Sequence, residues 1–157
     1  MNKFLRFTYS FATVAVTAAV AAFFSLQAMK TFYPSLNMPL FSPPDYVFAP
    51  VWSVLYTLMI FSYYIVLNST DAIQTQSATL LFLGQLFLQM LWSYVFFGIG
   101  FYAPAIVVIL LMIWTVYKMI ERFKSINKIA GNLQYPYLLW LIYAAYLNIG
   151  IAYLNAN

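Results

Sequence analysis

The residues of this chain that could do chemistry are aromatic or neutral and polar, and they recur at helical spacing. Steps of three and four residues place side chains on one face of an α-helix. Rings offer flat apolar surfaces, and amides offer uncharged hydrogen-bonding groups. These faces suit a flat hydrophobic ligand, but helix packing alone also produces such stripes. The three stripes are Trp52, Tyr56, Met59 and Tyr63; Gln85, Gln89, Trp92 and Phe96; and Trp140, Ala144, Asn148, Ile151 and Asn155.

Trp52 and Trp140 leave a second alternative open. Each follows a proline near the start of an apolar segment. Tryptophan is enriched in the belt where a membrane meets water. The two indoles are therefore candidates either for that belt or for the wall of a cavity.

The composition excludes much of ordinary catalysis. The chain has no Cys and no His, which excludes disulfides, thiolate metal sites, imidazole bases and His-ligated haem. Its carboxylates, Asp45, Asp71 and Glu121, stand before, between or at the end of the apolar segments. Ion-coupled pumps and small multidrug exporters usually keep a carboxylate inside the membrane. We expect no metal, no cofactor and no proton or ion relay.

The elements that carry these stripes must be membrane helices. Of 157 residues, 65% are apolar and 6% are charged, whereas a soluble domain has about 45–50% and about 25%. The apolar runs are continuous and about twenty residues long, the length at which an α-helix crosses a bilayer. They do not alternate as the strands of a membrane β-barrel do. We therefore predict an all-α membrane protein.

We predict five transmembrane helices in a single integral membrane domain, residues 1–157. The spans cover about 7–28, 47–67, 77–97, 101–122 and 134–155. The joint 68–76 is mostly polar, and Gly98 and Gly100 indicate a tight turn. The joint 29–46 contains four prolines and several aromatic residues and is too short and broken to span. Since an apolar loop must lie on something, we expect this segment to cover the mouth of a cavity.

The basic residues predict the orientation. If the spans alternate, six basic residues fall on one side and only Lys30 on the other. Lys and Arg accumulate in cytoplasmic loops, so the N-terminus should be cytoplasmic. These charges act as topology signals, and we expect no nucleic-acid partner. The six are Lys3, Arg6, Lys118, Arg122, Lys124 and Lys128.

The first apolar segment has an alternative interpretation as a signal peptide cut near Ala28. The segment is longer than the usual apolar region of such a peptide, so a first span is favoured. No Arg- and Ser-rich transit peptide precedes it, which favours a bacterial cell membrane.

Three ordered motifs resemble the TspO, or translocator protein, family. In the first, the loop Pro39-Leu-Phe-Ser-Pro-Pro44 leads into Phe48-Ala-Pro-Val-Trp52. The second is Gln85-Leu-Phe-Leu-Gln-Met-Leu-Trp-Ser93, and the third is Pro136-Tyr-Leu-Leu-Trp140 with Ala144-Ala-Tyr-Leu-Asn148. The resemblance implies a five-transmembrane-helix bundle with a proline-rich loop between helices 1 and 2, surrounded by membrane lipid and paired as a homodimer.

The resemblance also implies ligands and a site. The family binds tetrapyrroles such as protoporphyrin, sterols in animal members, and synthetic aromatic drugs, in a cavity under the first loop. Carried over to this chain, the ligand-binding residues are Tyr33, Pro43, Trp52, Tyr56, Gln89, Trp92, Trp140, Ala144 and Leu147.

Some positions depart from the family pattern. Gln89 replaces the usual Asn, and Ala49 replaces Gly. Ile149 and Tyr153 stand where animal members carry the Tyr and Arg of a sterol motif. We therefore expect an altered ligand preference, and the last helix does not indicate a sterol site.

The leading hypothesis is a membrane receptor that binds a metal-free porphyrin. If the protein also promotes light-dependent breakdown of the pigment, as some family members are reported to do, Trp52 and Trp140 would be the photochemical donors. Two alternatives remain: transport of tetrapyrroles or other amphiphiles, and a stress-signalling scaffold that acts through partner proteins.

Overall fold

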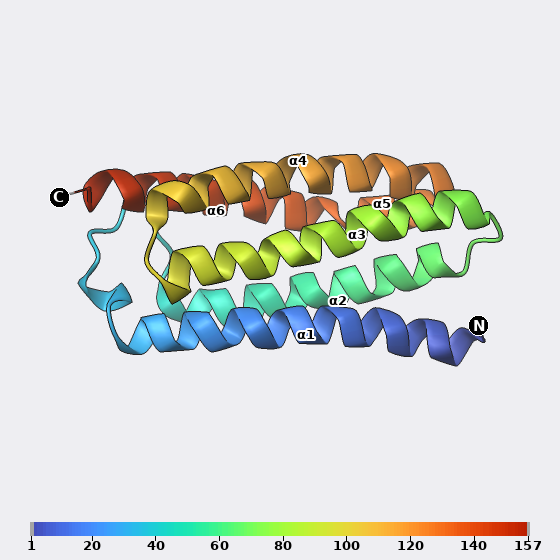
Figure 1. Ribbon diagram of the computed structural model, residues 1–157, viewed down its shortest axis with the longest axis horizontal. Coiled ribbons are helices and arrows are strands. Elements are labelled where there is room, and N and C mark those ends of the chain that lie inside the picture. The colour runs from blue at the N-terminus through green and yellow to red at the C-terminus, as the bar shows by residue number, and fades with distance from the viewer. Residues whose placement is uncertain (1, 157) are drawn as a thin grey trace.

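The computed structural model describes residues 2–156 as a bundle of long α-helices (Figure 1). Five helical segments of this part of the chain are long and apolar enough to cross a membrane, which confirms the predicted all-α, five-span architecture. The long helices are α1 (Lys3–Lys30), α2 (Phe48–Leu67), α3 (Ala72–Ser93), α4 (Tyr102–Ile126) and α6 (Tyr135–Leu154). The short elements are a π-helical turn at Tyr94–Gly98, the helix α5 (Lys128–Asn132), and 3₁₀ turns at Tyr33–Ser35 and Asp45–Val47.

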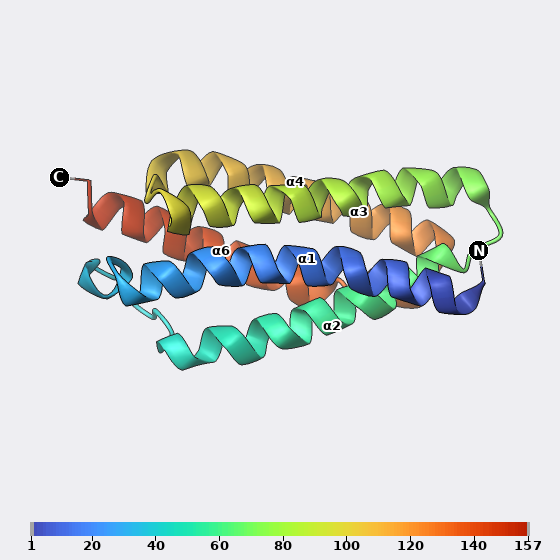
Figure 2. The ribbon, with the colours of Figure 1, turned by 60° about the horizontal axis from the view of Figure 1, so that its bottom comes forward.

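Successive spans run in opposite directions, so the two chain ends lie at opposite ends of the bundle (Figure 1). Among the long helices, the closest packed pairs are α1 with α2, α1 with α3, α3 with α4, and α4 with α6. In the view of Figure 2, α2 accordingly lies at one side of the bundle, away from α3 and α4. The backbones of α2 and α6 do not pack in this close way, and α5 joins α2 at one end. The bundle therefore has a seam between α2 and α6 that only side chains close.

The ends of the helices follow local capping chemistry. Asp71 begins α3 because its carboxylate accepts a hydrogen bond from the Gln74 backbone N–H at 2.9 Å, as an N-cap residue does. The helix thus starts five residues before the predicted position 77. Asn127 caps α5 in the same way, by accepting from Ile129 N at 2.8 Å. The predicted turn near residue 100 is present, where Gly100 has the left-handed φ of 67° that favours glycine.

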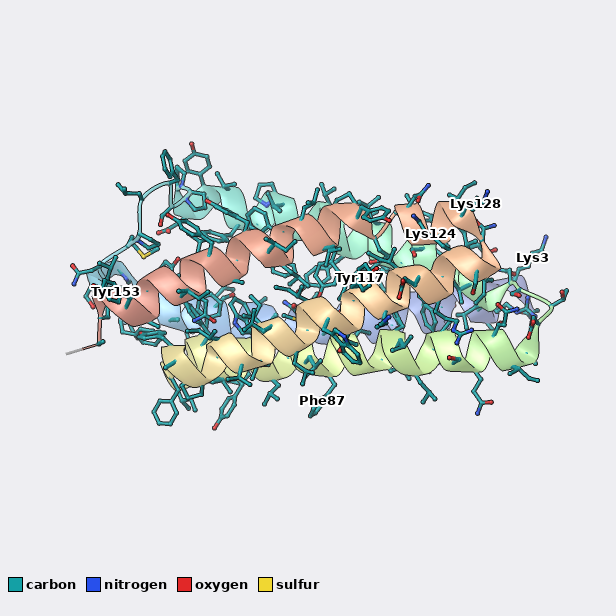
Figure 3. The ribbon with its side chains drawn as sticks, turned by 90° about the horizontal axis from the view of Figure 1, so that it is seen from above. Lys3, Phe87, Tyr117, Lys124, Lys128 and Tyr153 are labelled. Carbon is teal, nitrogen blue, oxygen red and sulfur yellow. The ribbon has the colours of Figure 1, made fainter. Side chains whose placement is uncertain are left out.

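The outer surface of the bundle is apolar. Large hydrophobic side chains such as Phe87 and Trp114 are 60% and 58% exposed, and Phe87 points away from the helices in Figure 3. Water would disfavour such a surface, whereas lipid tails solvate it. Together with the five apolar spans, this surface makes the chain an integral, multi-pass membrane protein.

Charge is distributed as the sequence predicted along the bundle. Lys3, Lys124 and Lys128 lie at one end, and Tyr153 lies at the other (Figure 3). Near the basic end, Lys118 and Glu121 form an ion pair at 2.9 Å. The cytoplasmic position of the N-terminus stays a prediction from this charge distribution.

A fully buried aromatic stack lies toward the basic end. Tyr63 of α2 stacks on Phe82 of α3 at a centroid distance of 4.0 Å, and Phe123 of α4 follows at 6.1 Å from Phe82. All three rings are fully buried. These rings pack α2, α3 and α4 together here, and the candidate site lies farther along α2 and α6.

Candidate functional site

The seam between α2 and α6 brings four aromatic side chains together, which we call the Trp52 cluster: Trp52, Tyr56, Tyr137 and Trp140. The Trp52 ring stacks on Tyr56 at a centroid distance of 5.3 Å. It meets Tyr137 edge-on at 6.2 Å and Trp140 edge-on at 6.5 Å. Tyr137 is 1% exposed, whereas the other three rings are half-buried. The cluster therefore reaches from the surface of the bundle into its interior.

A groove of about 530 Å³ borders this cluster at Trp140, on the same seam. It is open at the surface, and its lining is almost wholly apolar. Its volume falls within the range of about 300–1,000 Å³ that ligand pockets have. A lipid-soluble molecule could reach the Trp52 cluster from the bilayer through this groove. The lining residues are Pro50, Val51, Val54, Leu55, Pro136, Leu139, Trp140 and Tyr143.

Trp140 stands well inside the apolar span that carries it. Because α5 and α6 together form the span Lys128–Leu154, Trp140 stands 12 residues after its start and 14 before its end. At 1.5 Å per residue, each distance is about 20 Å. Trp140 thus stands away from both ends of this span, and the choice between the interfacial belt and a cavity wall stays a prediction for it. The proline before it, Pro136, lies in the first turn of α6.

A buried polar group lies behind the Trp52 cluster. The Tyr137 hydroxyl donates to Gln85 Oε1 at 2.9 Å and lies 3.3 Å from Gln89 Oε1. The Gln85 Nε2 group is buried and has no hydrogen-bond partner. Such a donor costs about 1–3 kcal/mol when it is left unpaired in an apolar interior. An acceptor atom on a ligand would remove this cost.

Trp92 makes a different kind of contact. Its indole N–H donates to Asn148 Oδ1 at 3.0 Å, and Asn148 Nδ2 donates to the Tyr102 carbonyl at 2.8 Å. The ring also stacks on Phe96 at 5.1 Å. Trp92 and Asn148 thus connect α3, α6 and α4. The structure gives Trp92 a packing contact, and its contact with a ligand stays a prediction.

The proline-rich loop, residues 31–47, crosses the end of the bundle next to the C-terminal end of α6 (Figure 1). Tyr143 and Tyr146 of α6 donate hydrogen bonds of 2.6 Å to the carbonyls of Phe41 and Leu40. Phe41 has a left-handed φ of 63°, which is unfavourable for a bulky residue. Because Tyr143 also lines the groove, the residue that holds the loop is part of the site.

Tyr33 anchors the start of this loop. Its side chain is 5% exposed, and its ring lies 5.9 Å from that of Phe97. Burial, with smaller contributions from Asp45 and Tyr143, raises the pKa of Tyr33 to about 12. The hydroxyl is therefore neutral at physiological pH.

The structure brings some of the predicted site residues together and separates others. Trp52, Tyr56 and Trp140 form one cluster, and Gln89 lies behind it. Ala144 and Leu147 are buried on α6. Pro43 is half-buried in the loop. The hollow at the seam is an open groove, and a closed cavity inside the bundle stays a prediction.

The stripe on α2 has two different roles along its length. Met59 and Tyr63 are fully buried and pack against the core, whereas Trp52 and Tyr56 are half-buried at the seam. Helix packing and ligand binding were alternatives for the whole stripe. The geometry assigns packing to its second half and leaves its first half available.

Sequence reasoning did not select Tyr137, although it is the most buried ring of the Trp52 cluster. Helical spacing could have found it, because Tyr137 precedes Trp140 by three residues and Ala144 by seven, which places all three on one face. Gln85 was part of a stripe but was not among the predicted binding residues. Its unpaired amide is visible only in the folded chain.

Within the described residues 2–156, no group of three or more acidic side chains could hold a metal ion. The candidate site contains rings, amides and hydroxyls. These groups bind by stacking and hydrogen bonding.

Comparison with known proteins identifies the family. The model of the TspO/MBR family matches residues 10–154. The chain belongs to the TspO/MBR family. It is 33% identical over 153 residues to the tryptophan-rich protein TspO of Archaeoglobus fulgidus, covering 97% of this chain and 98% of that protein. It is also 33% identical over 144 residues to the tryptophan-rich sensory protein of Cereibacter sphaeroides, covering 92% and 89%.

The human translocator protein is a more distant relative by coverage. It is 33% identical to the chain over 119 residues, which cover 74% of this chain and 70% of the human protein. The departures on the last helix of this TspO/MBR family member lie on its outer face. Ile149 is 48% exposed and Tyr153 is 83% exposed, so both face lipid or the membrane surface, away from the Trp52 cluster.

Proposed function

We propose that this TspO/MBR family member is a membrane receptor for a flat, hydrophobic tetrapyrrole of the protoporphyrin class. The observation that carries the proposal is the Trp52 cluster. One of its half-buried rings, Trp140, lines an open apolar groove, and an unpaired amide donor, Gln85 Nε2, is buried behind the cluster. Aromatic faces bind a macrocycle by stacking, and a few neutral polar groups orient its edge.

The proposed ligand enters from the bilayer through the groove between α2 and α6. Its ring lies against Trp140 and Trp52, and the proline-rich loop closes over it through Tyr143. A metal-free porphyrin fits this site better than haem, because the chain has no His or Cys to ligate iron. Tyr33, Pro43, Gln89, Trp92, Ala144 and Leu147 complete the proposed binding set.

A titration of the purified protein with protoporphyrin tests the proposal. Binding is followed by the shift of the pigment's main absorption band, in detergent and at fixed protein concentration. Aromatic pairs contribute about 0.5–1.5 kcal/mol beyond area burial, so Trp140→Leu should weaken binding by about two- to tenfold. The control is Trp114→Leu, because Trp114 is exposed on the outer face of α4. Equal affinity of the two variants would contradict the proposal, as would the absence of saturable binding.

We also propose photochemistry as an activity of the bound pigment. Trp52 and Trp140 lie edge-on at 6.5 Å from one another, and either indole could donate an electron or a hydrogen atom to an excited porphyrin beside it. The double variant Trp52→Phe with Trp140→Phe should slow the loss of pigment absorbance under light. The double variant and the unmodified protein are compared at saturating pigment, so that the same fraction of each protein holds a pigment. An unchanged rate at equal occupancy would remove these residues as donors.

Transport is the second candidate function. The relatives named translocator protein suggest it, and the groove open to the bilayer is the observation that favours it. Flux of protoporphyrin between vesicles that contain the protein would support transport. Binding without flux would leave the receptor proposal. We further propose that the protein forms a homodimer in a bacterial cell membrane, with its N-terminus in the cytoplasm. A role as a signalling scaffold would require that a partner protein be recovered from that membrane.

A further inference from the structure

A second pocket lies on the opposite side of the molecule from the seam residues, between α3 and α4. It has a volume of about 440 Å³. Leu81 of α3 is part of its wall, and the remaining lining residues all belong to α4: Trp114, Lys118, Glu121, Arg122 and Ser125. None of these residues belongs to the Trp52 cluster or to the groove beside it.

The lining of this α3–α4 pocket is graded from apolar to charged. Trp114, Lys118 and Arg122 follow one another at intervals of four residues, which places them on one face of α4. The indole of Trp114 lies about 12 Å from the level of Arg122 along the helix. Arg122 stands four residues before the end of α4 at Ile126, near the membrane surface. Trp114 is therefore at the depth of lipid tails.

The charges of the α3–α4 pocket favour an anion. Lys118 and Arg122 contribute two positive charges, and Glu121 contributes one negative charge. Glu121 forms an ion pair with Lys118 at 2.9 Å. Among the described residues, no carboxylate lies within salt-bridge distance of Arg122. Arg122 is therefore the cation of the lining that can pair with a ligand. The guanidinium group matches the geometry of a phosphate.

The polar end of the α3–α4 pocket is formed by both helices. The Ser125 hydroxyl lies 3.1 Å from Gln74 Oε1 of α3 and donates to the Arg122 carbonyl at 2.7 Å. The pocket thus has a polar, cationic end at the membrane surface and an apolar end inside the membrane. We propose that it binds an anionic phospholipid from the basic-end leaflet, with the phosphate at Arg122 and Lys118 and an acyl chain along Leu81 and Trp114.

Native mass spectrometry of the detergent-purified full chain tests the lipid site. The probes are phosphatidylglycerol and phosphatidylcholine with identical acyl chains. One basic residue near an anionic lipid changes binding by about fivefold, so Arg122→Gln should lower the preference for phosphatidylglycerol by about that factor. Glu121→Gln removes the opposing charge and should raise the preference.

The matched control is Lys128→Gln, which removes one positive charge at the same end of the bundle but outside the pocket (Figure 3). It should leave the lipid preference unchanged. An equal effect of Lys128→Gln and Arg122→Gln would show attraction to general surface charge and would overturn the site. A lack of preference in the unmodified protein would overturn it as well.

A second measurement tests the acyl-chain half of the proposal. Phosphatidylglycerol with brominated chains should quench the fluorescence of Trp114 more than brominated phosphatidylcholine does. The Trp114 fluorescence is taken as the difference between the unmodified protein and Trp114→Phe. Arg122→Gln should reduce the difference between the two lipids. Equal quenching by both lipids in the unmodified protein, or displacement of the lipid by glycerol phosphate alone, would contradict a lipid site.

Discussion

Two hydrogen bonds from α6 help to hold the proline-rich loop on the bundle. The Tyr143 and Tyr146 hydroxyls each donate at 2.6 Å to a loop carbonyl. A hydrogen bond contributes about 0.5–1.5 kcal/mol net, so the pair stabilises the closed loop by about 1–3 kcal/mol. The double variant Tyr143→Phe with Tyr146→Phe keeps both rings and removes both bonds. Loop opening should become about 5- to 150-fold more frequent.

Amide hydrogen exchange of the purified protein measures this opening. The Asn37 amide is a suitable reporter, because it donates to Asn155 Oδ1 at 3.0 Å only while the loop lies on α6. Its exchange should accelerate in the double variant, while amides in the middle of α1 keep their rates. Tyr153→Phe is the control, since Tyr153 lies on the same helix and is 83% exposed. Unchanged exchange in the loop, or equal acceleration in the control, would refute the reasoning.

Further predictions concern the interior, the loop contact and pH. Asn148→Leu removes two hydrogen bonds of a fully buried side chain and should lower the free energy of unfolding in detergent by about 1–3 kcal/mol. The exposed control Asn132→Ala should leave it unchanged. Gly150→Val should displace the loop, because a Cβ there would lie 2.6 Å from the Pro39 Cβ; protection of the loop amides at the unmodified level would contradict this. The raised pKa of Tyr33 means that its contribution to stability is present below pH 10 and is lost as pH rises toward about 12. Unfolding followed over this range should show a smaller loss in Tyr33→Phe, and an equal loss in both proteins would contradict the assignment.

The number and type of helices could be predicted because long apolar runs have few alternatives in a membrane. Their ends were less predictable. Residues 72–76 are polar enough to suggest a loop, but Asp71 caps a helix that begins there. The joint near residue 128 likewise contains α5, because Asn127 provides a cap. Capping depends on the local backbone path, which hydropathy does not describe.

The candidate site could be predicted in part. Helical spacing placed Trp52 with Tyr56 and predicted a polar face around Gln89, and the structure brings these faces to one seam. Spacing on a single helix could not show that α2 and α6 meet through side chains alone. It also could not show that Gln85 Nε2 lacks a partner, because both features depend on how three helices pack.

The central claim is that the ligand lies at the Trp52 cluster, and energy transfer from single tryptophans tests it most directly. Two proteins are compared, one that keeps only Trp140 and one that keeps only Trp114, with phenylalanine at the other three tryptophan positions. Titrated with protoporphyrin in the same detergent until the pigment's absorption shift is complete, the Trp140 protein should lose its emission saturably at one pigment per chain. At that saturation the Trp114 protein should lose much less. Equal quenching of both proteins, or quenching of Trp140 that never saturates, would contradict the account.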